Sequence, residues 1–155
     1  MIEVGQKAPN FTLYDTDKKP VSLDSYKGKK VVLLFFPMAF TSVCTTELCS
    51  VRDDIARYDN LNTAVLGISV DSVFTLAKFK EDQQLNFPLL SDFNKEVSTN
   101  YGALYETFAF DMKGVSKRAA FVINEDGIVQ HEEVLENAGN VPDFPAIQTA
   151  LSAIV

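Results

Sequence analysis

The sequence contains only two cysteines, Cys44 and Cys49, and only one histidine, His131. Structural zinc sites normally take four ligands of these residue types, so we expect neither a metal nor another cofactor. Two cysteines also form no disulfide framework, and a chain of this kind usually works in a reducing compartment. The scarcity of cysteine and histidine therefore favours a cytoplasmic protein without a metal centre.

The chain also lacks an excess of basic residues and a long apolar run. Its 14 Lys and Arg residues are outnumbered by 21 Asp and Glu residues, which gives a net charge of −7. Nucleic acids and anionic membranes attract basic surfaces, so neither is an expected partner. The longest apolar run, from Val31 to Phe40, is interrupted by Pro37 and is too short to cross a bilayer. No basic segment followed by an apolar stretch indicates a signal peptide.

Apolar segments that resemble strands alternate along the chain with segments that resemble helices. No repeat or linker divides the 155 residues, so we expect one domain spanning residues 1–155. The segments 31–36 and 64–69 are continuously apolar, as is typical of central strands that are covered on both faces. The other predicted strands are shorter: 11–13, and a hairpin of 119–123 and 128–133 around an Asp-Gly turn. The apolar segment 89–90 is expected to form either a brief strand or a turn.

Four helices are predicted between and after these strands. In the first, 43–58, an apolar residue recurs every three or four positions and defines one buried face, formed by Leu48, Val51, Ile55 and Tyr58. The others cover about 72–84, 96–101 and 144–154. Because strands alternate with helices and end in a hairpin, the pattern indicates an α/β fold of the thioredoxin kind, with a mixed central sheet flanked by helices.

Cys44 is expected in the first turn of the helix that follows the central strand, with Thr41 or Ser42 as the N-cap. Free N–H groups and the helix dipole at such a position favour a thiolate, which is the nucleophilic form of cysteine. Cys44 also shares the buried face with Leu48 and Val51. Because a cysteine on an apolar face is more often a packing residue, position alone leaves both roles open.

The residues around Cys44 match a known pattern. The segment Pro37-Met38-Ala39-Phe40-Thr41-Ser42-Val43-Cys44 resembles the peroxiredoxin signature, which has a proline, then Thr or Ser, then the peroxidatic cysteine at these spacings. Far downstream, 117–123 resembles the strand that begins with the active-site arginine of that family, here Arg118. The similarity extends over nearly the whole chain, and it implies a thioredoxin-like fold and a thiol-dependent peroxidase.

The resemblance implies a role for each matching residue. The Cys44 thiolate would attack the peroxide and become a sulfenic acid. Thr41 would hold the peroxide through its hydroxyl, and Arg118 would stabilise the thiolate and the developing charge. Pro37 would shape and shield the pocket. Glu47, one turn after Cys44, is given only a supporting or structural role.

Cys49 determines which branch of the family the chain resembles. The spacing Cys44-x-x-x-x-Cys49 is similar to that of the Q-type peroxiredoxins, also called bacterioferritin comigratory proteins, in which the second cysteine resolves the sulfenic acid as an intramolecular disulfide. The segment 36–41 also resembles the alkyl hydroperoxide reductase E-like branch, whose members lack that second cysteine. Cys49 is therefore either the resolving cysteine or a packing residue in a one-cysteine enzyme.

Other thiol chemistries fit the sequence less well. A thioredoxin-like dithiol exchanger would need Cys-x-x-Cys, but Glu47 occupies the second position. A cysteine phosphatase would need an arginine six residues after Cys44, where this chain has Ser50. A papain-like pair could use only His131, which matches no catalytic motif. A redox-inert interaction domain is the non-enzyme alternative, although it would not require the motif residues together.

The resemblance implies hydroperoxide substrates, and thioredoxin or another thiol as the reductant. Related proteins are monomers or homodimers. A dimer is slightly favoured, because three aromatic residues in segments that resemble loops could form an interface: Phe40, Phe108 and Phe110.

Overall fold

A computed structural model describes residues 2–154 and contains a central seven-stranded sheet with the strand order β2-β1-β5-β4-β3-β8-β9. The strands are β1 (Thr12–Asp15), β2 (Pro20–Ser22), β3 (Lys30–Phe35), β4 (Thr63–Ser69), β5 (Leu89–Ser91), β8 (Arg118–Ile123) and β9 (Val129–Leu135). The three central strands β3, β4 and β5 are parallel, whereas β1, β2, β8 and β9 pair antiparallel with their neighbours. The predicted mixed sheet and its closing hairpin are confirmed.

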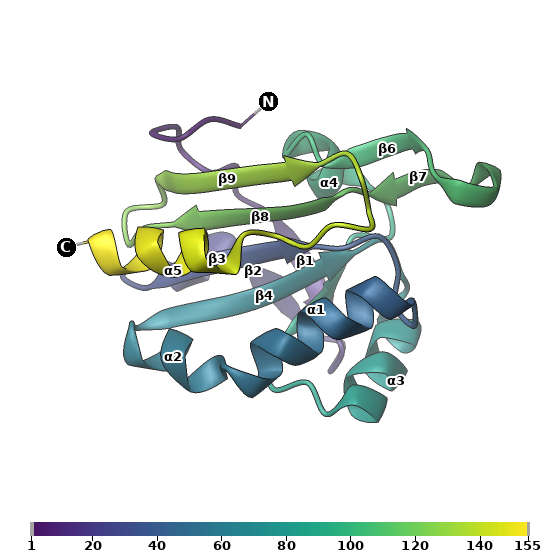
Figure 1. The fold of residues 1–155 in the computed structure, drawn as a ribbon, viewed down its shortest axis with the longest axis horizontal. Helices are drawn as coiled ribbons and strands as arrows, with labels where there is room; N and C mark the ends of the chain where they lie inside the picture. Colours follow the sequence, from purple (N-terminus) through teal and green to yellow (C-terminus); the bar gives the residue numbers. More distant parts are fainter. Residues whose placement is uncertain (1, 155) are drawn as a thin grey trace.

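Helices cover both faces of this sheet (Figure 1). They are α1 (Ser42–Asp53), α2 (Ile55–Asn60), α3 (Val73–Gln83), α4 (Glu96–Asn100) and α5 (Phe144–Ala153). Side chains of β3 alternate between the faces, because successive residues of a strand point to opposite sides. Val32 and Leu34 pack with α1, α2, α3 and α5, while Val31 and Leu33 pack with α4 and the N-terminal segment. Two apolar cores therefore fix β3, from which the chain enters α1.

The prediction of one continuous helix over 43–58 is wrong. The structure divides it into α1 and α2 at Asp54, whose φ of −113° and ψ of 14° are not helical. The Asp54 N–H donates to the carbonyl of Val51, three residues back, so the helix tightens before it breaks. No glycine or proline marks this break in the sequence. The apolar periodicity of the sequence continues across Asp54, because Tyr58 is buried in the same core as Val51.

The sequence did not indicate several short elements. These are β2, two 3₁₀ turns at Leu23–Tyr26 and Ala109–Asp111, and a separate antiparallel pair of β6 (Leu104–Thr107) and β7 (Lys113–Ser116). Strands this short, half-exposed and without strict alternation give little periodic signal. At the tip of the pair, Phe110 and Asp111 adopt φ of 58° and 59°, the left-handed region that non-glycine residues seldom occupy.

The ends of β3 and β4 and the beginning of β8 meet at one edge of the sheet, on the right in Figure 1. Phe35, the last residue of β3, pairs with Ile68 of β4 and with Ala119 of β8. Residues that follow β3 and β4 therefore lie beside the first residue of β8, although the sequence separates them widely. Within residues 2–154, no helix is long and apolar enough to span a membrane.

Candidate active site

Cys44 lies in the first turn of α1, just beyond the end of β3, and is 1% exposed. The N-cap is Thr41, the first of the two predicted candidates, but its side chain does not cap the helix. Its hydroxyl instead donates to the Met38 carbonyl, 2.7 Å away. The first N–H groups of an α-helix have no partner within the helix, and the dipole adds partial positive charge there. The thiol is thus enclosed at a position that favours an anion.

Arg118, the first residue of β8, reaches Cys44 from the neighbouring strand. Its Nη2 donates to Cys44 Sγ at 3.3 Å, and its Nη1 donates to Glu47 Oε1 at 2.6 Å. The guanidinium also donates to the Ala138 carbonyl, from Nη2 at 2.9 Å and from Nε at 3.3 Å. Arg118 and Glu47 are each 1% exposed, so this is a buried ion pair rather than a surface contact.

Burial and charge act in opposite directions on this pair. Burial raises the pKa of Glu47 to about 7, although the charge and the hydrogen bond of Arg118 act to lower it. Burial alone would lower the pKa of Arg118, but the charges and hydrogen bonds of Glu47 and Cys44 together outweigh this effect and raise that pKa. Arg118 therefore stays cationic, while Glu47 can change its charge near neutral pH.

The segment 37–41, which joins β3 to α1, is held by a residue that sequence analysis missed. Asp71, which follows β4, accepts a hydrogen bond through Oδ2 from the Ala39 N–H at 2.8 Å and from the Ser69 hydroxyl at 2.6 Å. Because β3 and β4 are parallel neighbours, residues that follow both strands meet at the same edge. An aspartate two residues after the end of the second buried strand was the available signal in the sequence.

A cavity of about 230 Å³ opens over Cys44. Its lining combines predicted and unpredicted residues: Pro37, Thr41, Ser42, Val43, Cys44, Phe108, Arg118, Ala138 and Gly139. The structure thus brings together Pro37, Thr41, Cys44 and Arg118, while Glu47 lies beneath them against Arg118. Phe108 directly follows β6 and Ala138 lies in the segment between β9 and α5, and no motif in the sequence marked either residue.

Cys49 lies apart from this cavity. It is half-buried on α1, and its Sγ donates to Gln83 Oε1 of α3 at 3.5 Å. Residues five apart in a regular helix have Cα atoms roughly 8 to 9 Å apart, beyond the limit of about 7 Å for a disulfide. Both cysteines are free, as this geometry requires.

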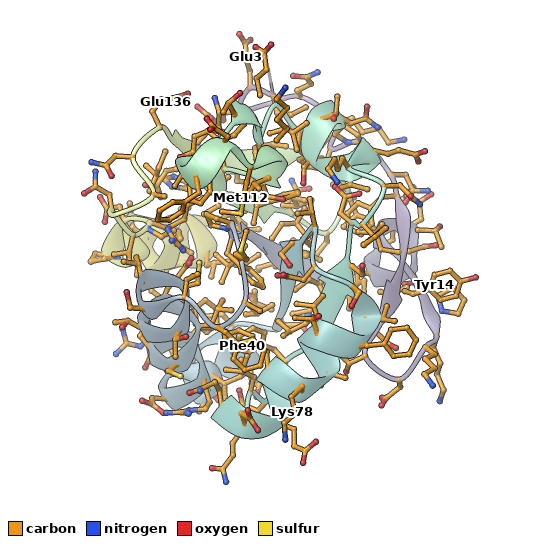
Figure 2. All side chains as sticks on the ribbon, turned by 90° about the vertical axis from the view of Figure 1, so that its right-hand side faces the viewer. Glu3, Tyr14, Phe40, Lys78, Met112 and Glu136 are labelled. Atoms are coloured by element: carbon orange, nitrogen blue, oxygen red, sulfur yellow. The ribbon has the colours of Figure 1, made fainter. Side chains whose placement is uncertain are left out.

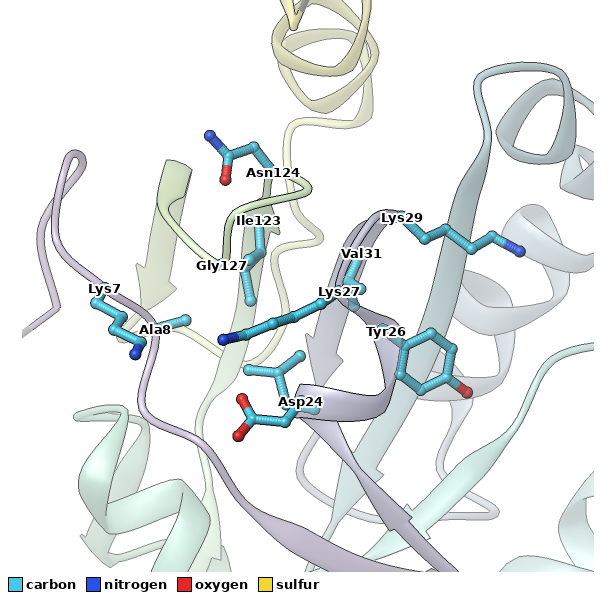
Figure 3. A pocket seen from close by; sticks show the side chains of 11 residues that line it. Lys7, Ala8, Asp24, Tyr26, Lys27, Lys29, Val31, Ile123, Asn124 and Gly127 are labelled. Carbon is cyan, nitrogen blue, oxygen red and sulfur yellow. The ribbon is translucent and has the colours of Figure 1, made fainter.

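Other polar sites lie away from Cys44. His131 pairs with Glu133 on β9 through Nε2 and Oε2, 2.8 Å apart, and it does not line the cavity over Cys44. A second cavity of about 20 Å³ lies between Lys7, Asp24 and Lys27 at the opposite end of β3 (Figure 3). That volume holds about one water molecule. Within residues 2–154, no group of three or more His, Cys, Asp or Glu side chains is arranged to hold a metal ion.

The aromatic residues considered for an interface differ in exposure. Phe40 is 51% exposed, and its ring contacts Phe79 edge-on, with the ring centres 5.2 Å apart. Phe110 is 93% exposed at the tip of the β6–β7 pair, whereas Phe108 is half-buried and lines the cavity. Phe40 and Met112 lie on the face that Figure 2 turns toward the viewer, at the end of the molecule where α1 begins. A dimer through this face stays a prediction.

A buried cysteine at the N-terminus of α1 is thus hydrogen-bonded to an arginine on the central sheet of an α/β fold. The chain belongs to the AhpC/TSA family, which matches residues 4–132. It is similar to the putative peroxiredoxin bcp of Haemophilus influenzae, with 42% identity over 129 residues that make up 83% of each chain. The name of this relative agrees with the predicted similarity to the Q-type, or bacterioferritin comigratory protein, branch.

A longer relative and a solved structure extend this comparison. The chloroplastic 2-Cys peroxiredoxin BAS1 of Spinacia oleracea is 40% identical over an alignment of 142 residues, and the match covers 84% of this chain and 52% of that protein. The chain therefore spans about half the length of that relative. The crystal structure of peroxidoxin BcpB from Mycobacterium tuberculosis superimposes with a TM-score of 0.88 at 29% identity, and it covers 100% of this chain and 99% of that one. The predicted thioredoxin-like fold is confirmed.

Proposed function

We propose that this chain is a thiol-dependent peroxidase that reduces hydrogen peroxide and organic hydroperoxides through Cys44. The observation that carries the proposal is the 3.3 Å contact between Arg118 Nη2 and Cys44 Sγ at the base of a cavity bordered by Pro37 and Thr41. A cation beside the sulfur stabilises the nucleophilic thiolate. Relatives named peroxiredoxin, on the same fold, support this assignment.

In the proposed reaction, the Cys44 thiolate attacks the terminal oxygen of the hydroperoxide. The S–O bond forms as the O–O bond breaks, the sulfur is oxidised to a sulfenic acid, and an alkoxide or hydroxide leaves and takes up a proton. Arg118 donates hydrogen bonds where negative charge develops, in a site that largely excludes water. Pro37 offers no N–H of its own and shields one side of the cavity.

Thr41 binds the peroxide in this proposal. Its hydroxyl already donates to the Met38 carbonyl, so its oxygen is free to accept the peroxide proton. Thr41→Val keeps the shape and removes this acceptor, so peroxide attack should slow by about 10²-fold or more. Thr41→Ser restores the hydroxyl and should recover most of the rate. Stopped-flow oxidation of Cys44 measures both variants, and equal rates in Thr41→Val and the unaltered protein would remove Thr41 from the site.

Cys49 resolves the sulfenic acid in the proposed cycle. A thiol five residues away has a high effective concentration, but the intact helix keeps the two cysteines too far apart for a bond. The first turns of α1 must therefore unwind after Cys44 is oxidised. A thiol reductant, which we propose to be thioredoxin, then attacks the exposed disulfide and lets the helix re-form.

Mass spectrometry after one equivalent of peroxide tests this cycle. The unaltered protein should lose two hydrogens as the disulfide forms, whereas Cys49→Ser should retain a sulfenic acid on Cys44. Accumulation of sulfenic acid in the unaltered protein would place it among the one-cysteine peroxiredoxins. An unchanged mass in both proteins would instead support the redox-inert alternative.

We also propose that residues 1–155 act as one peroxiredoxin domain in the cytoplasm, and that two copies associate through the end of the molecule that carries Phe40 and Phe110. Exposure of these two aromatic residues beside the active-site edge supports that surface.

A further inference from the structure

Two acidic side chains share the single positive charge of Arg118. Cys44 and Glu47 lie one turn apart on α1, and the guanidinium donates to one through Nη2 and to the other through Nη1. Arg118 can neutralise one anion but not both. A thiolate and a carboxylate together would leave an uncompensated negative charge in a site where all three side chains are 1% exposed.

The two acids are not equally well prepared to hold that negative charge. Cys44 lies in the first turn of α1, where the helix dipole favours an anion, and Glu47 lies one turn further along, where this effect has faded. Glu47 Oε2 is buried and has no hydrogen-bond partner among residues 2–154. A carboxylate with one unpartnered buried oxygen is costly, whereas a neutral carboxyl group is much less so.

We propose that Glu47 holds a proton while Cys44 is a thiolate and releases it when Cys44 becomes a sulfenic acid. This inference rests on the proposed peroxidase function and extends it. Negative charge then moves from Cys44 to Glu47 during oxidation, and Arg118 is paired with one anion before and after. Two acids that interact this closely titrate as a pair rather than as independent groups.

The proton balance of the oxidation follows from this exchange. A thiolate, a neutral Glu47 carboxyl and a hydroperoxide ROOH give a sulfenic acid, a Glu47 carboxylate and ROH. The sulfur gives up two electrons, and the O–O bond is reduced. The proton that Glu47 releases balances the one that the leaving oxygen takes up. The first half of the cycle therefore draws no net proton from solvent.

The surroundings of Glu47 are consistent with this role. Burial places the pKa of Glu47 at about 7, and a thiolate that competes for Arg118 would raise it further. Tyr58 of α2 also interacts with Glu47, and the pKa of Tyr58 is raised mainly by its own burial and slightly by Glu47, so Tyr58 stays neutral. The sequence of α5 has no titratable side chain.

Infrared difference spectroscopy can observe this proton directly. The Cys49→Ser variant stops at the sulfenic acid, so its spectrum can be recorded before and after the addition of peroxide. The difference between the two spectra should show the loss of one protonated carboxyl group and the gain of one carboxylate per chain. Both bands should disappear in Glu47→Gln, where a neutral amide oxygen can still accept from Arg118 Nη1. Glu136→Gln, which changes an exposed glutamate, is the control and should retain them.

Proton uptake gives a second measurement, made at a pH where ultraviolet absorbance shows that Cys44 is a thiolate. Oxidation of Cys49→Ser should take up no net proton, and the same protein with Glu47→Gln should take up one per sulfenic acid. Sulfenic acid that forms without a change at a carboxyl group would overturn the role of Glu47 and leave the peroxidase intact. Failure to form sulfenic acid at all would instead contradict the proposed function.

Discussion

Replacing Cys44 with serine should abolish peroxide reduction. A serine hydroxyl is not appreciably ionised at neutral pH and has no adjacent base here, because His131 lies elsewhere and Glu47 contacts Arg118. The loss should be on the order of 10⁴-fold or more, the scale for removing a nucleophile. The rate of peroxide consumption measures this loss, in assays that supply thioredoxin, glutaredoxin or a low-molecular-weight thiol separately. With the unaltered protein, thioredoxin should support the fastest turnover.

The control for this variant is Cys49→Ser, which removes the other thiol and should still consume one equivalent of peroxide. Serine is slightly smaller than cysteine and can accept from Arg118 Nη2, so Cys44→Ser should keep the native fold. A Cys44→Ser protein that still turns over peroxide would show that the chemistry occurs at another residue.

Replacing Arg118 with alanine should have the second largest effect, because it changes both activity and stability. Peroxide attack should slow by about 10²-fold or more, and less of Cys44 should be thiolate at a given pH, since the cation beside the sulfur is gone. The free energy of unfolding should fall by about 3–5 kcal/mol, as expected when one partner of a buried ion pair is removed. Stopped-flow oxidation, thiolate absorbance and urea unfolding measure these effects.

The stability loss in Arg118→Ala should depend on pH. Without Arg118, the folded-state pKa of Glu47 rises further above its ordinary value. An acid whose pKa is higher in the folded than in the unfolded state destabilises the fold as the pH increases above the unfolded-state pKa. The loss should therefore be smaller at about pH 5 than at about pH 8. Combining Arg118→Ala with Glu47→Gln should recover stability but not activity. Recovery of both would show that Arg118 serves only the fold.

The sequence by itself determined the local features of this protein. The continuously apolar segments became β3 and β4, because a central strand is covered on both faces, and the Asp-Gly turn became the β8–β9 hairpin. The spacing of Pro37, Thr41 and Cys44 placed the cysteine at a helix start, since a short loop after a strand leaves few alternatives. Such features depend on residues that are neighbours in the chain.

Only the tertiary structure decided the contacts across the sheet. Arg118 lies 74 residues after Cys44, and their hydrogen bond depends on the pairing of β8 with β3. Family resemblance named Arg118, but neither its ion pair with Glu47 nor its hydrogen bonds to the Ala138 carbonyl could be read from the chain. The hydrogen bond of Asp71 to the loop before α1 likewise depends on the strand order, which places the ends of β3 and β4 side by side. Sequence periodicity reports which face of an element is buried, whereas the sheet topology decides what that face contacts.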